Sequence, residues 1–316
     1  MKLQQLRYVL EIVRQNNHLS AAAEALHTSQ PGVSRQILLL EAELGFEIFQ
    51  RTRNRIIGVT EPGRLVLDIA KRVVTDVDAL RSVKEDVNSG NSGTFTVATT
   101  HTQARYVLPM VIEQFVSKYP EVQLVLKQGN PEEICSLVDT GEADLAIGTD
   151  TLVEFPNLVR LPCFSLPRSV VAKAGHPILA VKDLTLKAIA SYPIISYDPR
   201  YSGRWRVMKA FKNAGLEPKI ILSAIDADVC KTYIELGLGI GILTTITFDP
   251  NRDVGLRARS ADHLFEPSTI FINLRSNTYL RPYILDFIKT VAPKLTSTVV
   301  RRALQDREPA GPSGNS

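Results

Sequence analysis

Hydrophobic positions in the first 45 residues recur at helical spacing in three short segments. Each segment predicts a short helix with one buried face, and polar turns separate the segments. The apolar positions are Leu3, Leu6, Leu10 and Val13 in the first segment, Ala22, Ala23 and Leu26 in the second, and Val33, Ile37, Leu40 and Leu44 in the third. The second and third helices, hinged at residues 27–30, are typical of a helix-turn-helix that reads DNA.

Polar side chains occupy the free face at the beginning of the third helix. Gln30, Ser34 and Arg35 lie there, Ser29 is the expected N-cap, and Pro31 belongs to the same turn. The beginning of such a helix enters a major groove, where these side chains meet base edges and phosphates. We therefore expect all five residues to contact DNA. The alternative is a helical hairpin that only packs.

A basic arm follows the third helix. Residues 48–60 contain Arg51, Arg53 and Arg55 but no acidic residue, and the β-prone residues 55–60 predict a hairpin. Such an arm suits the phosphate backbone or minor groove beside the reading helix. A run of charges is usually only a solvated face, but its place beside a helix-turn-helix favours DNA contact for the three arginines.

A long apolar stripe comes next and predicts a helix over residues 61–88. Its members recur every three or four residues, close to the coiled-coil period of about 3.5. They are Val66, Ile69, Val73, Val77, Leu80, Val83 and Val87. So narrow a stripe cannot form the core of a domain, so we expect a second copy of the chain to cover it. Packing against the chain's own first helix would account for only part of it.

The pattern changes after the polar, glycine-containing residues 88–93. Strand patterns now alternate with helix patterns, which implies a parallel sheet with both faces covered. The predicted strands are 94–99, 122–128, 143–148, 168–172, 193–197, 219–224, 240–244 and 270–274. The predicted helices are 104–118, 131–140, 204–214, 226–236 and 283–291.

Polar side chains gather where the first of these strands ends. Residues 99–103 are all polar, and Thr149 follows a second buried strand. Ligands of open α/β sheets bind at such strand ends, and the free N–H groups of a following helix favour an anion. Thr100, Thr102 and Gln103 add neutral donors without a fixed positive charge. The alternative is that the threonines only cap the helix. A cap needs fewer polar residues than this turn contains.

Composition excludes several other classes of function. The 316 residues imply at least two domains, and the net charge of +4 is too small to indicate nucleic acid by itself. The three cysteines and five histidines show no metal-ligand spacing, and phosphate-loop and nucleophile-elbow motifs are absent from the sequence. We therefore expect neither an enzyme nor a metal or cofactor. No signal peptide or membrane span is evident, which predicts a cytoplasmic location.

The chain resembles the LysR-type transcriptional regulators. The resemblance rests on the stretch SQPGVSR at residues 29–35 followed by Leu40, Glu41, Leu44, Gly45, Phe49, Arg51, Thr60 and Gly63. Residues 98–106 and 226–233 further resemble the CysB-like branch, whose members regulate sulfur assimilation. The resemblance implies effector contacts at Thr100, Thr102, Gln103, Thr149 and Ser202. It also shows a departure at Leu166, where relatives usually have Trp, so effector selectivity is expected to differ.

The resemblance also implies a domain organisation and a set of partners. We expect an α/β protein with a winged helix-turn-helix at 1–60, a linker helix at 61–89 and an effector domain at 90–300, before a disordered tail at 301–316. The effector domain resembles a periplasmic binding protein, with subdomain I at 94–163 and 267–300 and subdomain II at 164–266. Expected partners are promoter DNA, RNA polymerase, further copies in a dimer or tetramer, and a small anion such as sulfate or acetylserine. The alternative function is a small-molecule binding or transport receptor with an attached helical assembly module.

Overall fold

The computed structural model describes residues 1–53, 55–88, 92–276 and 278–305. Within the helix at 61–88 it describes side chains up to Leu80, except those of residues 75, 78 and 79. The chain forms two compact units, Met1–Ser89 and Gly90–Ser316. No helix among the described residues is long and apolar enough to cross a bilayer.

The first unit contains the predicted helix-turn-helix. Its helices are α1 (Leu3–Arg14), α2 (Leu19–Ala25) and α3 (Gln30–Leu44). The Ser29 hydroxyl accepts a hydrogen bond from the Gly32 N–H at 3.3 Å, which caps the beginning of α3 as expected. Gly45 ends this helix in the left-handed conformation, with φ of 80°, which glycine adopts without steric cost. The apolar faces of all three helices share one core, to which Val9, Ile12, Val33 and Ile37 contribute fully buried side chains.

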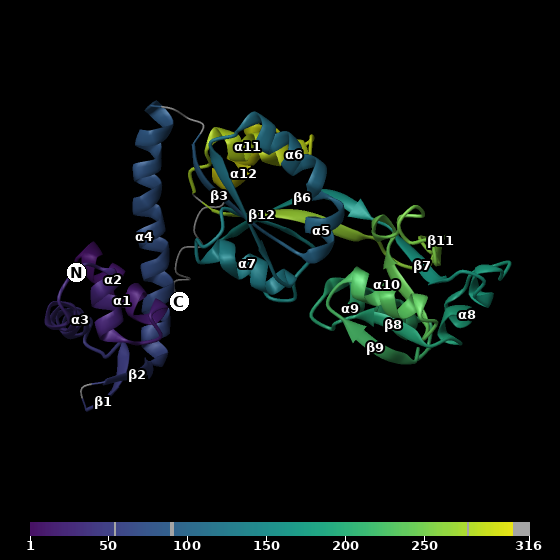
Figure 1. Ribbon diagram of the computed structural model, residues 1–316, viewed down its shortest axis with the longest axis horizontal. Helices are drawn as coiled ribbons and strands as arrows, with labels where there is room; N and C mark the ends of the chain where they lie inside the picture. The colour runs from purple at the N-terminus through teal and green to yellow at the C-terminus, as the bar shows by residue number, and fades with distance from the viewer. Residues whose placement is uncertain (54, 89–91, 277, 306–316) are drawn as a thin grey trace, which may run out of the picture. The chain divides into compact units, whose positions relative to one another are not determined.

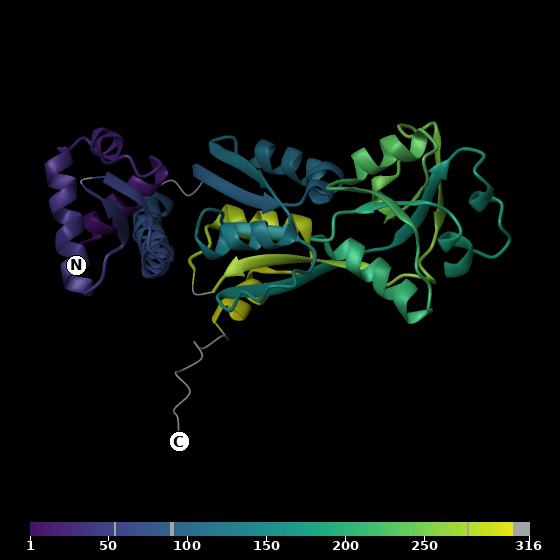
Figure 2. The ribbon, with the colours of Figure 1, turned by 90° about the horizontal axis from the view of Figure 1, so that it is seen from below.

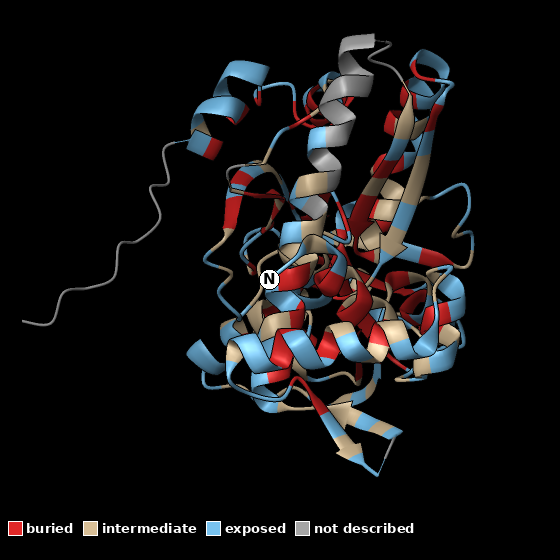
Figure 3. Ribbon diagram, turned by 90° about the vertical axis from the view of Figure 1, so that its left-hand side faces the viewer, coloured by how far each residue is buried: buried red, intermediate tan, exposed pale blue. Residues whose placement is uncertain are grey.

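A two-stranded wing leads from α3 into a long helix. Strands β1 (Phe49–Thr52) and β2 (Arg55–Val59) pair antiparallel, and most of the hairpin is exposed or half-buried (Figure 3). Helix α4 (Glu61–Asn88) follows, and the Thr60 hydroxyl accepts the Gly63 N–H at 2.9 Å. A Cβ at Gly63 would lie 2.1 Å from the Ile48 carbonyl oxygen. Only glycine therefore allows the first turn of α4 to approach the wing so closely.

The apolar stripe of α4 is divided between two environments. Leu67 and Ala70 are buried in the core of the first unit, and Val66 packs partly against that core. By contrast, Ile69 is 52%, Val73 38% and Leu80 72% exposed. The chain's own helices therefore cover part of Val66, in line with the alternative of packing against the first helix. Val83 and Val87 lie outside the described side chains.

Subdomain I contains a five-stranded sheet in the order β4-β3-β5-β12-β6. Strands β3 (Gly93–Thr99), β4 (Val122–Gln128) and β5 (Leu145–Gly148) are parallel, whereas β12 (Ser268–Arg275) is antiparallel to β5 and to β6 (Leu158–Leu166). The predicted all-parallel sheet is therefore wrong, because β12 enters from the other subdomain. Figure 1 shows α6 (Leu108–Lys118) and α11 (Pro282–Val291) on one face of this sheet and α7 (Pro131–Asp139) on the other.

Two further differences from the sequence prediction concern helices. The predicted helix 104–118 is two helices, α5 (His101–Tyr106) and α6, because Pro109 at the beginning of α6 interrupts the hydrogen-bond ladder. The predicted tail at 301–316 begins too early, because α12 (Ser297–Gln305) continues to residue 305. Helix α12 buries Val300 and Leu304 in the core of subdomain I. The rest of that tail lies outside the described residues.

Subdomain II contains a second five-stranded sheet in the order β11-β7-β10-β8-β9. Its strands are β7 (Arg168–Lys173), β8 (Ile194–Tyr197), β9 (Ile220–Ala224), β10 (Ile240–Thr244) and β11 (Leu256–Ser260). Helices α8 (Leu186–Ala190) and α9 (Ser202–Asn213) pack on one face, and α10 (Ala227–Glu235) on the other (Figure 2). Strands β7 and β10 are antiparallel, so this sheet is mixed as well. The chain crosses between the subdomains twice, between β6 and β7 and between β11 and β12.

Candidate functional site

The beginning of α3 presents the predicted DNA-reading residues on one solvent face. Ser29, Gln30, Pro31 and Arg35 are exposed and Ser34 is half-buried. The Ser20 hydroxyl on α2 donates to the Gln30 side-chain oxygen at 3.3 Å, so the turn of the helix-turn-helix orients Gln30. The guanidinium of Arg35 lies on the exposed surface.

The three arginines of the wing differ in their surroundings. Arg53 and Arg55 are exposed, whereas Arg51 forms an ion pair with Glu41 of α3 at 2.7 Å. Glu41 is 6% exposed, and its Oε1 also accepts the backbone N–H groups of Ile48 and Phe49 at 2.8 and 3.1 Å. Arg51 therefore differs from the other two arginines of the wing, because its charge also compensates a buried carboxylate.

A cavity in the second unit lies between the two subdomains. One wall comes from subdomain I and contains five of the six predicted effector residues, namely Thr100, Thr102, Gln103, Thr149 and Leu166. Ser202 is not part of the lining, but it lies between the lining residues Tyr201 and Gly203. The cavity leaves about 40 Å³ for the centres of water-sized molecules. This space suits a few waters or a compact ligand.

The polar turn at the end of β3 contributes less positive potential than the sequence suggested. Helix α5 has only six residues, so its aligned peptide dipoles are few. The Thr100 hydroxyl donates to the Gln103 side-chain oxygen, which satisfies part of the polar surface from within. Thr99 faces away from the cavity and donates to the Ile147 carbonyl oxygen at 2.9 Å. The turn thus offers neutral polar groups, as predicted, but not a strong helix terminus.

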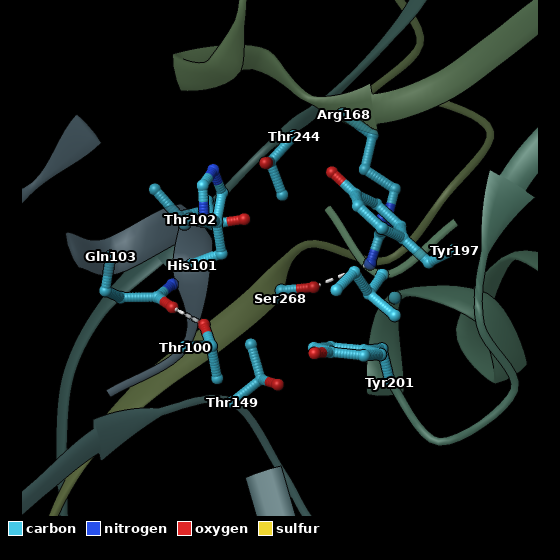
Figure 4. Close-up of a pocket in the computed structure, with 13 residues that line it drawn as sticks. Thr100, His101, Thr102, Gln103, Thr149, Arg168, Tyr197, Tyr201, Thr244 and Ser268 are labelled. Atoms are coloured by element: carbon cyan, nitrogen blue, oxygen red, sulfur yellow. Dashed lines mark hydrogen bonds between the residues drawn. The ribbon is translucent and has the colours of Figure 1, made fainter. Parts of the chain in front are cut away.

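The opposite wall contains residues that sequence reasoning missed. They are Arg168, Tyr197, Tyr201, Gly203 and Thr244 from subdomain II and Ser268 from the start of β12. Figure 4 shows Arg168 and Tyr201 facing Thr100 and Thr149 across the cavity. One signal was present in the sequence, because Arg168 begins a strand that is otherwise small or apolar. A charged residue in a fully buried strand is uncommon and marks a paired or functional group.

Arg168 is the charged residue of this cavity. Its side chain is fully buried; Nη2 donates to the Ser268 hydroxyl at 2.6 Å and Nε to the Glu266 carbonyl oxygen at 3.4 Å. Burial lowers the pKa of Arg168 to about 10, which still leaves it cationic at neutral pH. Nη1 has no hydrogen-bond partner among the described residues. The cavity therefore contains a fixed positive charge beside the neutral donors that the sequence predicted.

Ion pairs join the subdomains on both sides of the cavity. On one side, Asp228 of α10 contacts His101 at 2.9 Å, Tyr106 at 2.6 Å and Arg105 at 2.8 Å, all on α5. Burial would raise the pKa of Asp228, but hydrogen bonds from His101 and Tyr106, and then the nearby Lys231 and Arg105, lower it to about 2. On the other side, Arg206 of α9 pairs with Asp150, which follows Thr149, and with Glu266.

This unit shows one group of side chains with metal-ligand geometry. His101, Asp226 and Asp228 place one ligand atom each within 4.8 Å of the others. Asp228, however, already pairs with Arg105, and Lys231 lies 3.4 Å away. Asp226 caps α10 by accepting the Val229 N–H at 2.8 Å. The group is therefore accounted for by ion pairing and helix capping.

Comparison with known proteins identifies the family. Residues 3–64 match the bacterial regulatory helix-turn-helix protein, lysR family, and residues 88–296 match the LysR substrate binding domain. The chain belongs to the LysR family of transcriptional regulators. The family resemblance, the winged helix-turn-helix with a two-subdomain α/β domain, and the non-enzymatic function predicted from the sequence are thereby confirmed. The transport-receptor alternative is not favoured.

Individual relatives extend over nearly the whole chain. The transcriptional regulator SsuR of Burkholderia cenocepacia is 47% identical over 97% of this chain and 99% of its own. The regulator CysB of the same species is 45% identical over 96% of this chain and 97% of its own. Among solved structures, the cofactor-binding domain of the Cbl transcriptional regulator has 39% identity and a TM-score of 0.66, covering 68% of this chain and 95% of that domain.

Burial determines the reactivity of the three thiols of this LysR-type regulator. Burial raises the pKa of Cys135 and of Cys163 to about 11, and that of Cys230 to about 12. A thiol of such pKa is protonated at neutral pH and reacts slowly, because the thiolate is the nucleophile. All three are free cysteines. Their surroundings are those of structural residues.

Arg51→Ala should loosen the wing, whereas Arg53→Ala should not. Arg51 is 25% exposed, so we reduce the roughly 3–5 kcal/mol typical of breaking a fully buried pair to about 2 kcal/mol. Hydrogen exchange of the full-length protein should show faster exchange at residues 48–49 in Arg51→Ala alone. Equal exchange in the two variants would contradict the structural role of the Glu41–Arg51 pair.

Proposed function

We propose that this LysR-type regulator binds promoter DNA through α3 and the wing and responds to a small sulfur-containing anion in the cavity between its subdomains. The observation that carries this proposal is the combination, in one chain, of an exposed helix-turn-helix surface and a cavity whose walls contain neutral hydroxyl and amide groups and one buried arginine. Its resemblance to the CysB-like branch supports control of sulfur assimilation or organosulfur use. Regulation would take place in the cytoplasm and involve RNA polymerase.

The DNA contacts fall into two groups. Ser29, Gln30, Pro31, Ser34 and Arg35 lie at the beginning of α3, where side chains reach base edges in a major groove. Arg53 and Arg55 lie on the exposed wing, where they favour phosphates of any sequence, and Arg51 contributes there in addition to its pairing with Glu41. The first group therefore provides sequence readout, and the second provides affinity.

Arg35→Ala should reduce specific binding in particular. We expect a loss of roughly 1–3 kcal/mol on the operator and little loss on random DNA, because Arg35 is exposed at the end from which a reading helix contacts bases. Arg53→Ala is the matched control and should weaken both kinds of DNA similarly, lowering the salt slope by about 1. Titrations at several salt concentrations measure both quantities. Equal losses for Arg35→Ala on the two DNAs would contradict its assignment to readout.

The effector would bind between Thr100, Thr102, Gln103 and Thr149 on one side and the residues around Ser202 on the other. The small cavity favours a compact anion such as sulfate or thiosulfate over acetylserine in this arrangement of the subdomains. Leu166 is buried beside the cavity, so Leu166→Trp would occupy ligand space and change the ranking of effectors. Effector binding would alter the relative orientation of the subdomains only if one orientation binds it more tightly.

Thr102→Ala tests the place of the effector. A hydroxyl that donates to an anion contributes on the order of 1.5–3 kcal/mol, so affinity should fall accordingly. Calorimetry on the full-length protein, with the sulfur anion that most raises its melting temperature, measures this loss. Thr290→Ala on α11 is the control, because that hydroxyl donates to the Asp286 carbonyl oxygen outside the cavity. Parental affinity in Thr102→Ala would mean that the effector binds elsewhere.

Self-association would cover the exposed part of the α4 stripe. Ile69, Val73 and Leu80 remain exposed in the single chain, and Val77 lies between the last two in the same stripe. A second α4 would bury them as in a coiled coil. We therefore propose a dimer through α4 that assembles further into a tetramer.

Val77→Glu should disrupt this association, because a buried unpaired carboxylate is costly. Sedimentation should show smaller species, and operator affinity should fall with them. Arg64→Glu introduces the same side chain at an exposed position of α4 and should leave the oligomer intact. An unchanged oligomer in Val77→Glu would exclude the stripe as the contact.

A further inference from the structure

Arg168 is a buried charge without a matching carboxylate. It begins β7 with a fully buried side chain, and its pKa is lowered by burial and by Arg206, while Tyr197 opposes this effect. The described residues provide it with a hydroxyl and a carbonyl oxygen as acceptors, but with no ion pair. Removing a guanidinium from water is costly unless an anion compensates it. Among the described residues, the fold therefore holds a buried cation that no carboxylate pairs with.

The unsatisfied side of this guanidinium lies toward the cavity. Nε and Nη2 are engaged with Glu266 and Ser268, whereas Nη1 has no partner among the described residues, and Arg168 lines the cavity. Figure 4 shows the guanidinium directed toward the space between Ser268 and Tyr201. The buried hydroxyl of Ser202 is likewise without a hydrogen-bond partner in the described structure.

The beginning of α9 adds a second positive feature at the same place. Helix α9 has 12 residues, its N-cap Tyr201 provides no side-chain cap, and Gly203 in its first turn lines the cavity. The first N–H groups of a helix have no intrahelical acceptor, and the helix dipole favours an anion there. A Cβ at Gly203 would lie 3.6 Å from Arg168 Nη1, so the guanidinium approaches this helix terminus closely. Both potentials favour an anion at this point.

We propose that Arg168 and the first turn of α9, with the Ser202 hydroxyl, form an anion seat that selects effectors carrying a negatively charged, multi-oxygen head group. The inference rests on the proposed effector cavity and adds that charge is recognised by subdomain II, whereas subdomain I supplies neutral donors. An anion in the seat would contact both subdomains at once. It would also compensate the buried cation, so neutral molecules of the same shape are rejected.

Three ligands of similar shape but different charge test whether the cavity recognises the charge of its ligand. Sulfate is a dianion, methanesulfonate a monoanion and dimethyl sulfone neutral, and all three have tetrahedral sulfur. Calorimetry and thermal shifts on the full-length protein, at constant ionic strength set with chloride, should show binding of the two anions and none of the sulfone. Sulfone binding comparable to that of sulfate would overturn the seat.

Arg168→Met tests the residue itself. Affinity for sulfate should fall roughly ten- to a hundred-fold or more, because a charge-assisted contact is lost. The ligand-free variant should melt no lower than the parent, because an uncompensated buried charge has been replaced by an apolar side chain. A merely structural arginine would give the opposite result for stability. Arg168→Lys keeps the charge without the planar fork, and should bind with intermediate affinity and the same ranking of the three ligands.

Arg204→Met is the matched control. It removes an arginine charge from the first turn of α9, but Arg204 does not line the cavity, so sulfate affinity should stay near the parental value. Parental sulfate affinity in Arg168→Met would overturn the seat and leave the proposed effector cavity standing. Failure of the parent protein to bind either anion would overturn both proposals.

Discussion

The antiparallel pairing of β6 with β12 is the constraint on which the effector unit depends. Both strands belong to the sheet of subdomain I, and each has one end where the chain crosses to subdomain II. Their register places Leu166 opposite Ser268, at the edge of the cavity. Arg168 follows Leu166 by two residues and donates to that same Ser268 hydroxyl. The two crossing strands, the cavity and the buried cation are therefore directly connected. A rotation of subdomain II must displace one wall of the cavity.

Two groups of ion pairs hold the two subdomains in their present arrangement. Asp228 fixes α10 to α5 on one side, and Asp150 fixes α9 to subdomain I on the other. Asp150 directly follows Thr149, and His101 directly follows Thr100, so both groups are covalent neighbours of cavity residues. A ligand that moves either threonine must also move an ion-paired side chain.

Local pattern predicted most of the elements but missed strands β6 and β11 and helices α8 and α12, and it predicted the assembly less well. The helices of the first unit follow directly from apolar spacing and capping residues such as Ser29 and Gly45, because these interactions lie within a few residues. The antiparallel entry of β12 was not predictable, because strand direction in the sheet depends on a crossing more than a hundred residues after β5. The polar turn at Thr100 could be predicted, because ligands bind where the strands of an open α/β sheet end. The role of Arg168 was missed. Its burial depends on Ser268 and α9, which are remote in sequence.

The buried carboxylate of Glu41 has a consequence for how a promoter is read. It accepts two N–H groups at the start of β1 and pairs with Arg51, so α3 and the wing behave as a single rigid body. Such a body presents groove-reading and phosphate-binding groups at a fixed separation and cannot stretch to follow distorted DNA. In the dimer proposed above, each such unit would therefore move as a whole, and a change in the distance between two units would bend or straighten the DNA between them.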